Sequence, residues 1–152
     1  MIQGEVWGAD LGVRSVHLFC AGENPWAISI DVERMSNRAD ELDALWNKVY
    51  EVFSSHDVVF VEEPPLAGVR NIRTFAALSQ VFAVVLTAAP KAYGVEVSTW
   101  KKQVVGKGNA TKEEVQGWLT ANNPAYAALC GDQNLTDAAC VALYGHAVLD
   151  RL

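Results

Sequence analysis

The spacing of apolar residues is the feature that most limits the possible folds of this chain. It changes along the chain from the alternation typical of strands to the three- and four-residue steps typical of helices. Apolar residues alternate, or form short runs, in residues 5–10, 15–20 and 27–32, which predicts three short strands joined as an antiparallel meander. Residues 37–54 then change to steps of three and four, which predicts an amphipathic helix. An all-apolar run at residues 58–61 predicts a buried central strand.

The second half of the chain is predicted to be mostly helical. Residues 72–89 predict a long helix whose only charge is Arg73, and its apolar surface is broad enough to be buried or to pack against a second subunit. Residues 95–98 predict a strand, residues 111–119 a helix with a Thr111–Glu114 capping box, and residues 135–148 an alanine-rich last helix. This order predicts an α/β fold, with a mixed sheet between helices on both faces.

Length and composition exclude several classes of protein. The 152 residues fit one domain, residues 1–152, and 51% hydrophobic residues with 20% charged ones can build a core. No apolar run approaches the roughly 18–20 residues that span a bilayer, and no secretory signal is recognisable, so we expect no membrane association. The three cysteines are widely spaced and form neither a disulfide framework nor a zinc motif, which predicts a reducing, cytoplasmic setting.

Charge is distributed unevenly along the chain. The net charge of −6 alone argues against a polyanionic partner. Residues 64–112, however, hold seven basic residues against one acid, Glu96, and the remainder is strongly acidic. This distribution is typical of a protein that binds a phosphate backbone with one surface and gathers carboxylates on another. A chance excess of charge on a solvated face is the alternative explanation.

Three carboxylates stand where predicted elements begin or end. Asp10 ends the first strand, Glu62 ends the fourth, and Asp137 lies in the first turn of the last helix. If the first and fourth strands are neighbours, all three can meet at one end of the sheet. Carboxylate oxygens suit Mg²⁺ or Mn²⁺, and two such ions roughly 4 Å apart can promote phosphodiester hydrolysis. The structural alternatives are a strand-ending turn at Asp10 and a helix cap in which Asp137 pairs with Asn134.

The stretch KKQVVGKGNATKEEVQGWL, residues 101–119, resembles the RuvC family of Holliday junction resolvases. Further family patterns follow in the same order: GADLGVR at the first strand, FVEEPP at the central strand and DAACVALYGHAV in the last helix. The resemblance covers nearly the whole chain, whose length is similar to that of phage-borne members. It implies a ribonuclease H-like fold, with a mixed five-stranded sheet flanked by helices. It also implies a homodimer that nicks branched DNA, such as a four-way junction, at two symmetric positions.

The resemblance also implies roles for individual residues. Asp10, Glu62 and Asp137 match catalytic acids that hold two Mg²⁺ ions, which Mn²⁺ can replace. Lys112 and Lys101 match basic positions near the scissile phosphate. A phage-encoded member would act in the cytoplasm of the host cell.

One acidic position of the family is occupied by an amide here. The fourth metal ligand falls on Asn134, and Asp132, two residues earlier, is the alternative ligand. The amide leaves open a junction-binding protein with weak or lost catalysis, and the fold leaves open a ribonuclease H-like enzyme that acts on RNA. The residues expected to contact DNA are Arg70, Arg73, Lys101, Lys102, Lys107 and Lys112.

Overall fold

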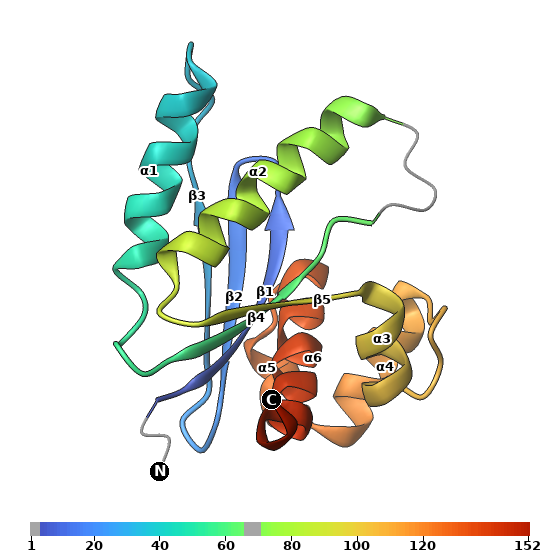
Figure 1. Cartoon of the computed structure of the whole chain (residues 1–152). Coiled ribbons are helices and arrows are strands. Elements are labelled where there is room, and N and C mark those ends of the chain that lie inside the picture. The colour runs from blue at the N-terminus through green and yellow to red at the C-terminus, as the bar shows by residue number, and fades with distance from the viewer. Residues whose placement is uncertain (1–3, 66–70) are drawn as a thin grey trace.

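The computed structural model describes residues 4–65 and 71–152 (Figure 1). Strands and helices follow each other along the chain much as the hydrophobic periods predict. The elements are β1 (Val6–Gly12), β2 (Ser15–Ala21), β3 (Trp26–Asp31), α1 (Arg38–Tyr50), β4 (Val58–Glu62), α2 (Ile72–Ala88), β5 (Ala92–Val95), α3 (Val97–Val104), α4 (Lys112–Asn122), α5 (Pro124–Leu129), α6 (Gln133–Val148) and the short 3₁₀ helix η1 (Leu149–Arg151).

The strands form one mixed five-stranded sheet with the order β3-β2-β1-β4-β5. The first three strands are the predicted antiparallel meander, and β4 and β5 run parallel to β1. Strand β1 therefore lies directly beside β4, which is the condition for Asp10 and Glu62 to meet. The predicted α/β class and mixed sheet are confirmed.

Helices cover both faces of the sheet, as expected (Figure 1). Helices α1 and α2 enclose one core with apolar side chains such as Leu18 and Val61. Helix α6, with α3 and α4, encloses the second core around Phe60 and Trp100. Within the described part of the chain, no helix is long and apolar enough to cross a membrane.

Helix α6 approaches the sheet unusually closely because the facing residues are small. A Cβ atom on Gly8 would overlap the backbone of Ala138 and Ala142, and one on Gly145 would overlap the ring of Phe60. Ala138 and Ala142 are fully buried, so this alanine-rich helix packs closely on the sheet. The start of α6 is thereby held against the carboxyl-terminal ends of β1 and β4.

The predicted strand at residues 95–98 is wrong. Strand β5 lies earlier, with Val95 as its last residue, and α3 begins at Val97. Val97, Trp100 and Val104 recur at steps of three and four, so a helix places these side chains on one side, against the second core. The short helix α5 was not predicted from the sequence.

Two helix starts also differ from the prediction. Helix α6 begins at Gln133, two residues earlier than expected, and Asp132 is its N-cap. At α4 only half of the capping box forms: the Thr111 hydroxyl accepts the Glu114 amide N–H at 3.2 Å. The Glu114 carboxylate instead accepts a hydrogen bond from the Lys107 ammonium at 3.1 Å.

Candidate active site

Three carboxylates from separate elements meet at one end of the sheet. Each of Asp10, Glu62 and Asp137 offers one oxygen, and these oxygens all lie within 4.8 Å of one another. The register that pairs Ala9 with Val61 places Asp10 level with Glu62, and the close packing of α6 on β1 brings Asp137 to both. The predicted convergence of the three acids is therefore present in the structure.

Burial and mutual repulsion make this cluster unfavourable as three free anions. Burial, followed by the charges of Glu62 and Asp137, raises the pKa of Asp10 from 3.8 to about 8. Burial, followed by the charge of Asp137, raises the pKa of Glu62 from 4.5 to about 7. Burial also raises the pKa of Asp137, although Gln133, Lys101 and Lys112 act in the opposite direction.

The donor set fits a divalent cation. Three carboxylates supply oxygen ligands only, which is the chemistry that Mg²⁺ and Mn²⁺ prefer. Burial first, and then the neighbouring carboxylates, raise the pKa values of Asp10 and Glu62, so the free anions are disfavoured there. A bound divalent ion would supply the missing positive charge and would displace the protons from the carboxyl groups.

Two neutral side chains orient the acids, and sequence analysis missed both. The Trp100 indole N–H donates to Glu62 Oε2 at 2.8 Å, and the Gln133 amide donates to Asp137 Oδ1 at 3.0 Å. The three-and-four spacing of apolar residues around Trp100 could have revealed its helix. Nothing in the sequence indicates its contact with Glu62, because the two residues are 38 positions apart.

The two candidates for a fourth ligand lie at the start of α6. Asp132 lies outside the group of three acids, and its Oδ1 accepts the backbone N–H of Leu135 at 3.0 Å, which caps the helix. It is nevertheless near enough to contribute to the raised pKa of Asp10. Asn134 is exposed in the first turn of the helix. The capping alternative for Asp137 is wrong, because the cap residue is Asp132.

The four lysines of the predicted DNA-binding set lie on α3, on α4 or between them. Lys101 and Lys112 are near enough to Asp137 to lower its pKa, and the Lys101 ammonium also donates to the Ala110 carbonyl at 3.0 Å. Lys102 is exposed on α3, and Lys107 forms an exposed ion pair with Glu114. A cationic surface thus borders one side of the acidic cluster.

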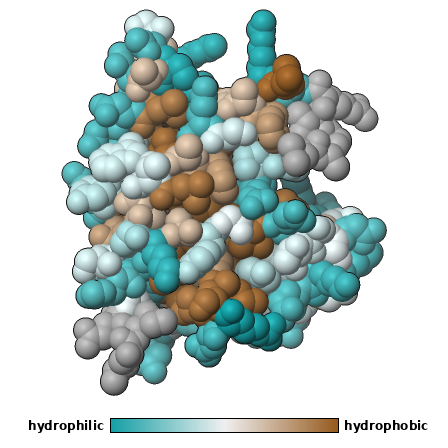
Figure 2. Space-filling view, in the orientation of Figure 1, coloured by the Kyte–Doolittle hydropathy of each residue, from teal (hydrophilic) through white to brown (hydrophobic). Residues whose placement is uncertain are grey.

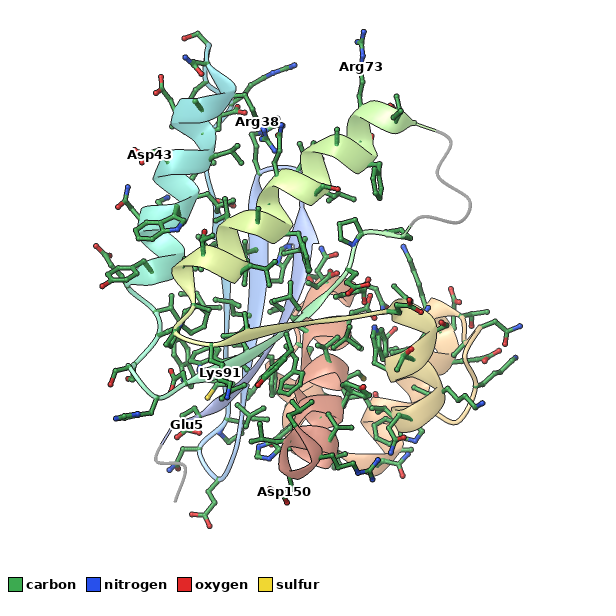
Figure 3. The ribbon with its side chains drawn as sticks, in the orientation of Figure 1. Glu5, Arg38, Asp43, Arg73, Lys91 and Asp150 are labelled. Carbon is green, nitrogen blue, oxygen red and sulfur yellow. The ribbon has the colours of Figure 1, made fainter. Side chains whose placement is uncertain are left out.

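The rest of the basic block does not join this surface. Arg73 points into solvent at the start of α2 (Figure 3). Lys91 precedes β5 beside the start of β4, at the opposite end of these strands from Glu62. Arg70, which was predicted to contact DNA, lies outside the described residues. The excess of basic residues between positions 64 and 112 therefore corresponds to more than one surface.

Two pockets open beside the acids. The smaller one is lined by Asp10, Glu62 and Leu78, together with the prolines that follow β4. The other has a volume of about 360 Å³ and lies between those prolines and the start of α3, where Glu96 and Ser98 line it. Asp10 and Glu62 are thus reached from the surface through the smaller pocket.

Comparisons with known proteins identify the architecture. No protein-family model and no curated protein matches the sequence. Among solved structures, RuvC of Thermus thermophilus matches with a TM-score of 0.72 at 20% sequence identity, over 97% of this chain and 96% of that chain. This chain has the RuvC fold. The structure of T. thermophilus RuvC in complex with a Holliday junction substrate also matches, with a TM-score of 0.74 at 21% identity, over 98% of this chain and 96% of that chain.

The RuvC fold accounts for the whole described architecture rather than for a part of it. Both matches extend over nearly the full length of both chains, so the five-stranded sheet and its flanking helices belong to one shared arrangement. The fold expected from the sequence resemblance is thereby confirmed.

Proposed function

We propose that this protein is a metal-dependent, structure-selective endodeoxyribonuclease that resolves four-way or other branched DNA junctions by paired nicks. The observation that carries the proposal is the convergence of Asp10, Glu62 and Asp137, with Lys101 and Lys112 beside them, on the RuvC fold. A solved neighbour with this fold is in complex with a Holliday junction substrate, which supports branched DNA as the ligand.

The three acids would hold the metal. We propose Mg²⁺ as the natural ion, in two copies, with Mn²⁺ as a substitute and with Asp132 or Asn134 as a further ligand. The ions, when bound, would supply a water that ionises at neutral pH and would stabilise the leaving oxygen. The chain itself contributes fixed carboxylate positions, since all three acids lie on regular elements packed against the two cores.

The basic side chains would hold the DNA strand at the site. Lys101 and Lys112 lie close enough to the acids to bind the scissile phosphate, and Lys112 is the one we propose as catalytic. Lys102 and Lys107 would extend the contact along the backbone. Lys107 can leave its ion pair with Glu114 to contact a phosphate, because an exposed ion pair contributes only about 0–1 kcal/mol. For Arg73 and Arg70 we propose more distant phosphate contacts.

A homodimer would place two such sites on one junction. The outward side of α2 exposes apolar residues at steps of three, four and seven: Ile72, Ala76, Ala83 and Leu86. Figure 2 shows apolar surface on the face that includes α1 and α2. A two-fold dimer through this face would bury that surface and give the symmetry that paired nicks require.

We also propose that residues 1–152 act as a single nuclease domain in a cytoplasmic setting. Both flanking helix layers share one sheet, which supports a single unit. The three cysteines are free thiols, which supports a reducing compartment such as the cytoplasm of a host cell.

Cleavage of a synthetic four-way junction tests the proposal. The protein is incubated with the junction, a flap, a linear duplex and an RNA–DNA hybrid, with Mg²⁺ or Mn²⁺. We expect symmetric nicks in two opposed strands of the junction and none with Asp10→Asn, which should still bind. Tight junction binding without nicks in either metal would instead support a junction-binding protein. Faster cleavage of the hybrid would support an enzyme that acts on RNA.

A further inference from the structure

A buried tryptophan forms a hydrogen bond with one of the three acids. The side chain of Trp100 is fully buried in the second core, and its indole N–H donates to Glu62 Oε2 at 2.8 Å. The indole has one polar group, a donor, so a buried tryptophan needs an acceptor within reach. In this core the acceptor is a carboxylate oxygen of the acidic cluster.

We propose that Trp100 is a positioning residue that fixes the Glu62 carboxylate for metal binding. One carboxylate oxygen of Glu62 lies within 4.8 Å of the ligand oxygens of Asp10 and Asp137, and the indole bond to Oε2 fixes the orientation of that carboxylate. This inference rests on the proposed function of the acidic cluster as a metal site. It adds that a rigid element outside the three acids determines how one of them presents its ligand atom.

The neutrality of the donor matters for this role. A lysine or arginine at this position would orient Glu62 but would also neutralise the negative charge that attracts a cation. The indole orients the carboxylate and leaves its charge available, as partners outside the ligand set do at other metal sites. Lys101, the next residue, lies with its ammonium 5.7 Å from the Trp100 ring centroid. Helix α3 thus presents the neutral Trp100 indole to Glu62, and its Lys101 ammonium lies beside the indole ring.

The chain contains a matched control for this contact. The Trp7 indole N–H donates to Asp57 Oδ2 at 3.0 Å, and both residues are buried. This second pair lies at the opposite ends of β1 and β4, because Trp7 is near the start of β1 and Asp57 immediately precedes β4. Replacing either tryptophan removes one buried indole–carboxylate hydrogen bond, but only Trp100 touches the acidic cluster.

The experiment compares Mn²⁺ binding by the parent, Trp100→Phe and Trp7→Phe proteins, by calorimetric titration without DNA. We expect Trp100→Phe to bind Mn²⁺ about 10–100-fold more weakly, the usual effect of losing such a partner. Trp7→Phe should lose thermal stability yet bind Mn²⁺ as the parent does. In junction nicking, Trp100→Phe should need more Mn²⁺ for half-maximal rate and should approach the parent rate at saturating metal.

The outcomes separate this inference from the proposed function. Equal Mn²⁺ affinity in the parent and in Trp100→Phe overturns the positioning role but leaves the nuclease proposal intact. If the parent binds Mn²⁺ and Trp100→Phe binds it more weakly, but the parent nicks no junction, the positioning role stands and the nuclease proposal is overturned. A parent that binds no Mn²⁺ overturns both. If Trp100→Phe does not fold, replacing Trp100 by 3-benzothienylalanine exchanges the N–H for sulfur in the same shape, and the same weakening is expected.

Discussion

Asp10→Asn should stabilise the metal-free protein while abolishing its response to metal. The pKa of Asp10 is raised from 3.8 to about 8, so between these values the folded protein holds a proton that the unfolded chain releases. Stability therefore falls as the pH rises through this window, because the folded state binds more protons than the unfolded state. Below pH 4 the cost is absent, and above pH 8 it is present in full.

The expected magnitude follows from that shift. Each pKa unit corresponds to about 1.4 kcal/mol, so an ionisable Asp10 costs on the order of 4 kcal/mol at pH 7. Asparagine carries no charge, but burying its amide costs about 1–3 kcal/mol where hydrogen bonds are incomplete. The net stabilisation should be about 1–3 kcal/mol, and for a chain of this size about 2–4 °C in Tm per kcal/mol.

Denaturant unfolding in EDTA at several pH values measures the effect, with Asp43→Asn as control. Asp43 is exposed on α1, on the far face of the sheet from α6 (Figure 3), so its replacement should change stability by less than about 0.5 kcal/mol. Added Mn²⁺ should stabilise the parent and the control but not Asp10→Asn. The reasoning is refuted if Asp10→Asn is no more stable than the parent in EDTA at pH 8, or if its advantage does not shrink toward pH 4.

Four further predictions concern the DNA and the dimer. Glu62→Gln should nick at least 100-fold more slowly than the parent in quenched time courses while its junction Kd stays within a few-fold. Lys102→Ala should weaken junction binding and lower the salt slope of log K by about 1, as measured by anisotropy, because it removes one phosphate contact. Lys112→Ala should instead lower the single-turnover nicking rate by at least 10-fold at saturating enzyme, and a change in affinity alone would contradict its catalytic role. Leu86→Glu should convert a dimer to a monomer by light scattering at micromolar concentration, and a parent that is already monomeric would contradict the proposed dimer.

The spacing of apolar residues along the sequence was sufficient to predict the strands of the meander and the long helices. Apolar residues recur in these elements at the step of a strand or of a helix, although β1 and β2 are buried on both sides. Helix α3 has only eight residues, and Val95 and Val97 alternate across its first boundary like a strand. The prediction followed this short alternation, whereas the burial of Trp100 depends on packing against α6, which local sequence does not contain.

The sequence predicted the acids of the candidate site but not the side chains that form hydrogen bonds with them. Glu62 ends β4, but β1 continues two residues past Asp10 to Gly12, so the expectation that Asp10 ends its strand is wrong. Adjacency of the two strands was the tertiary assumption that brought these two acids together. The contacts of Trp100 and Gln133 depend on side-chain orientation in the packed state. Asp132 illustrates a further difficulty, since an aspartate before a helix suits both metal binding and capping, and only the structure places its oxygen on the Leu135 amide.

The close approach of α6 to β1 creates both the acidic site and its energetic cost. Because Gly8 has no Cβ, the backbone of α6 near Ala138 and Ala142 can lie directly on β1, and Asp137 is carried next to Asp10. The same approach removes water from Asp10, which is the largest contribution to its raised pKa. A looser interface would relieve the repulsion but would also separate the ligand atoms. Instability of the metal-free cluster and readiness to bind a cation are therefore two consequences of one packing contact, and a change that weakens one should weaken the other.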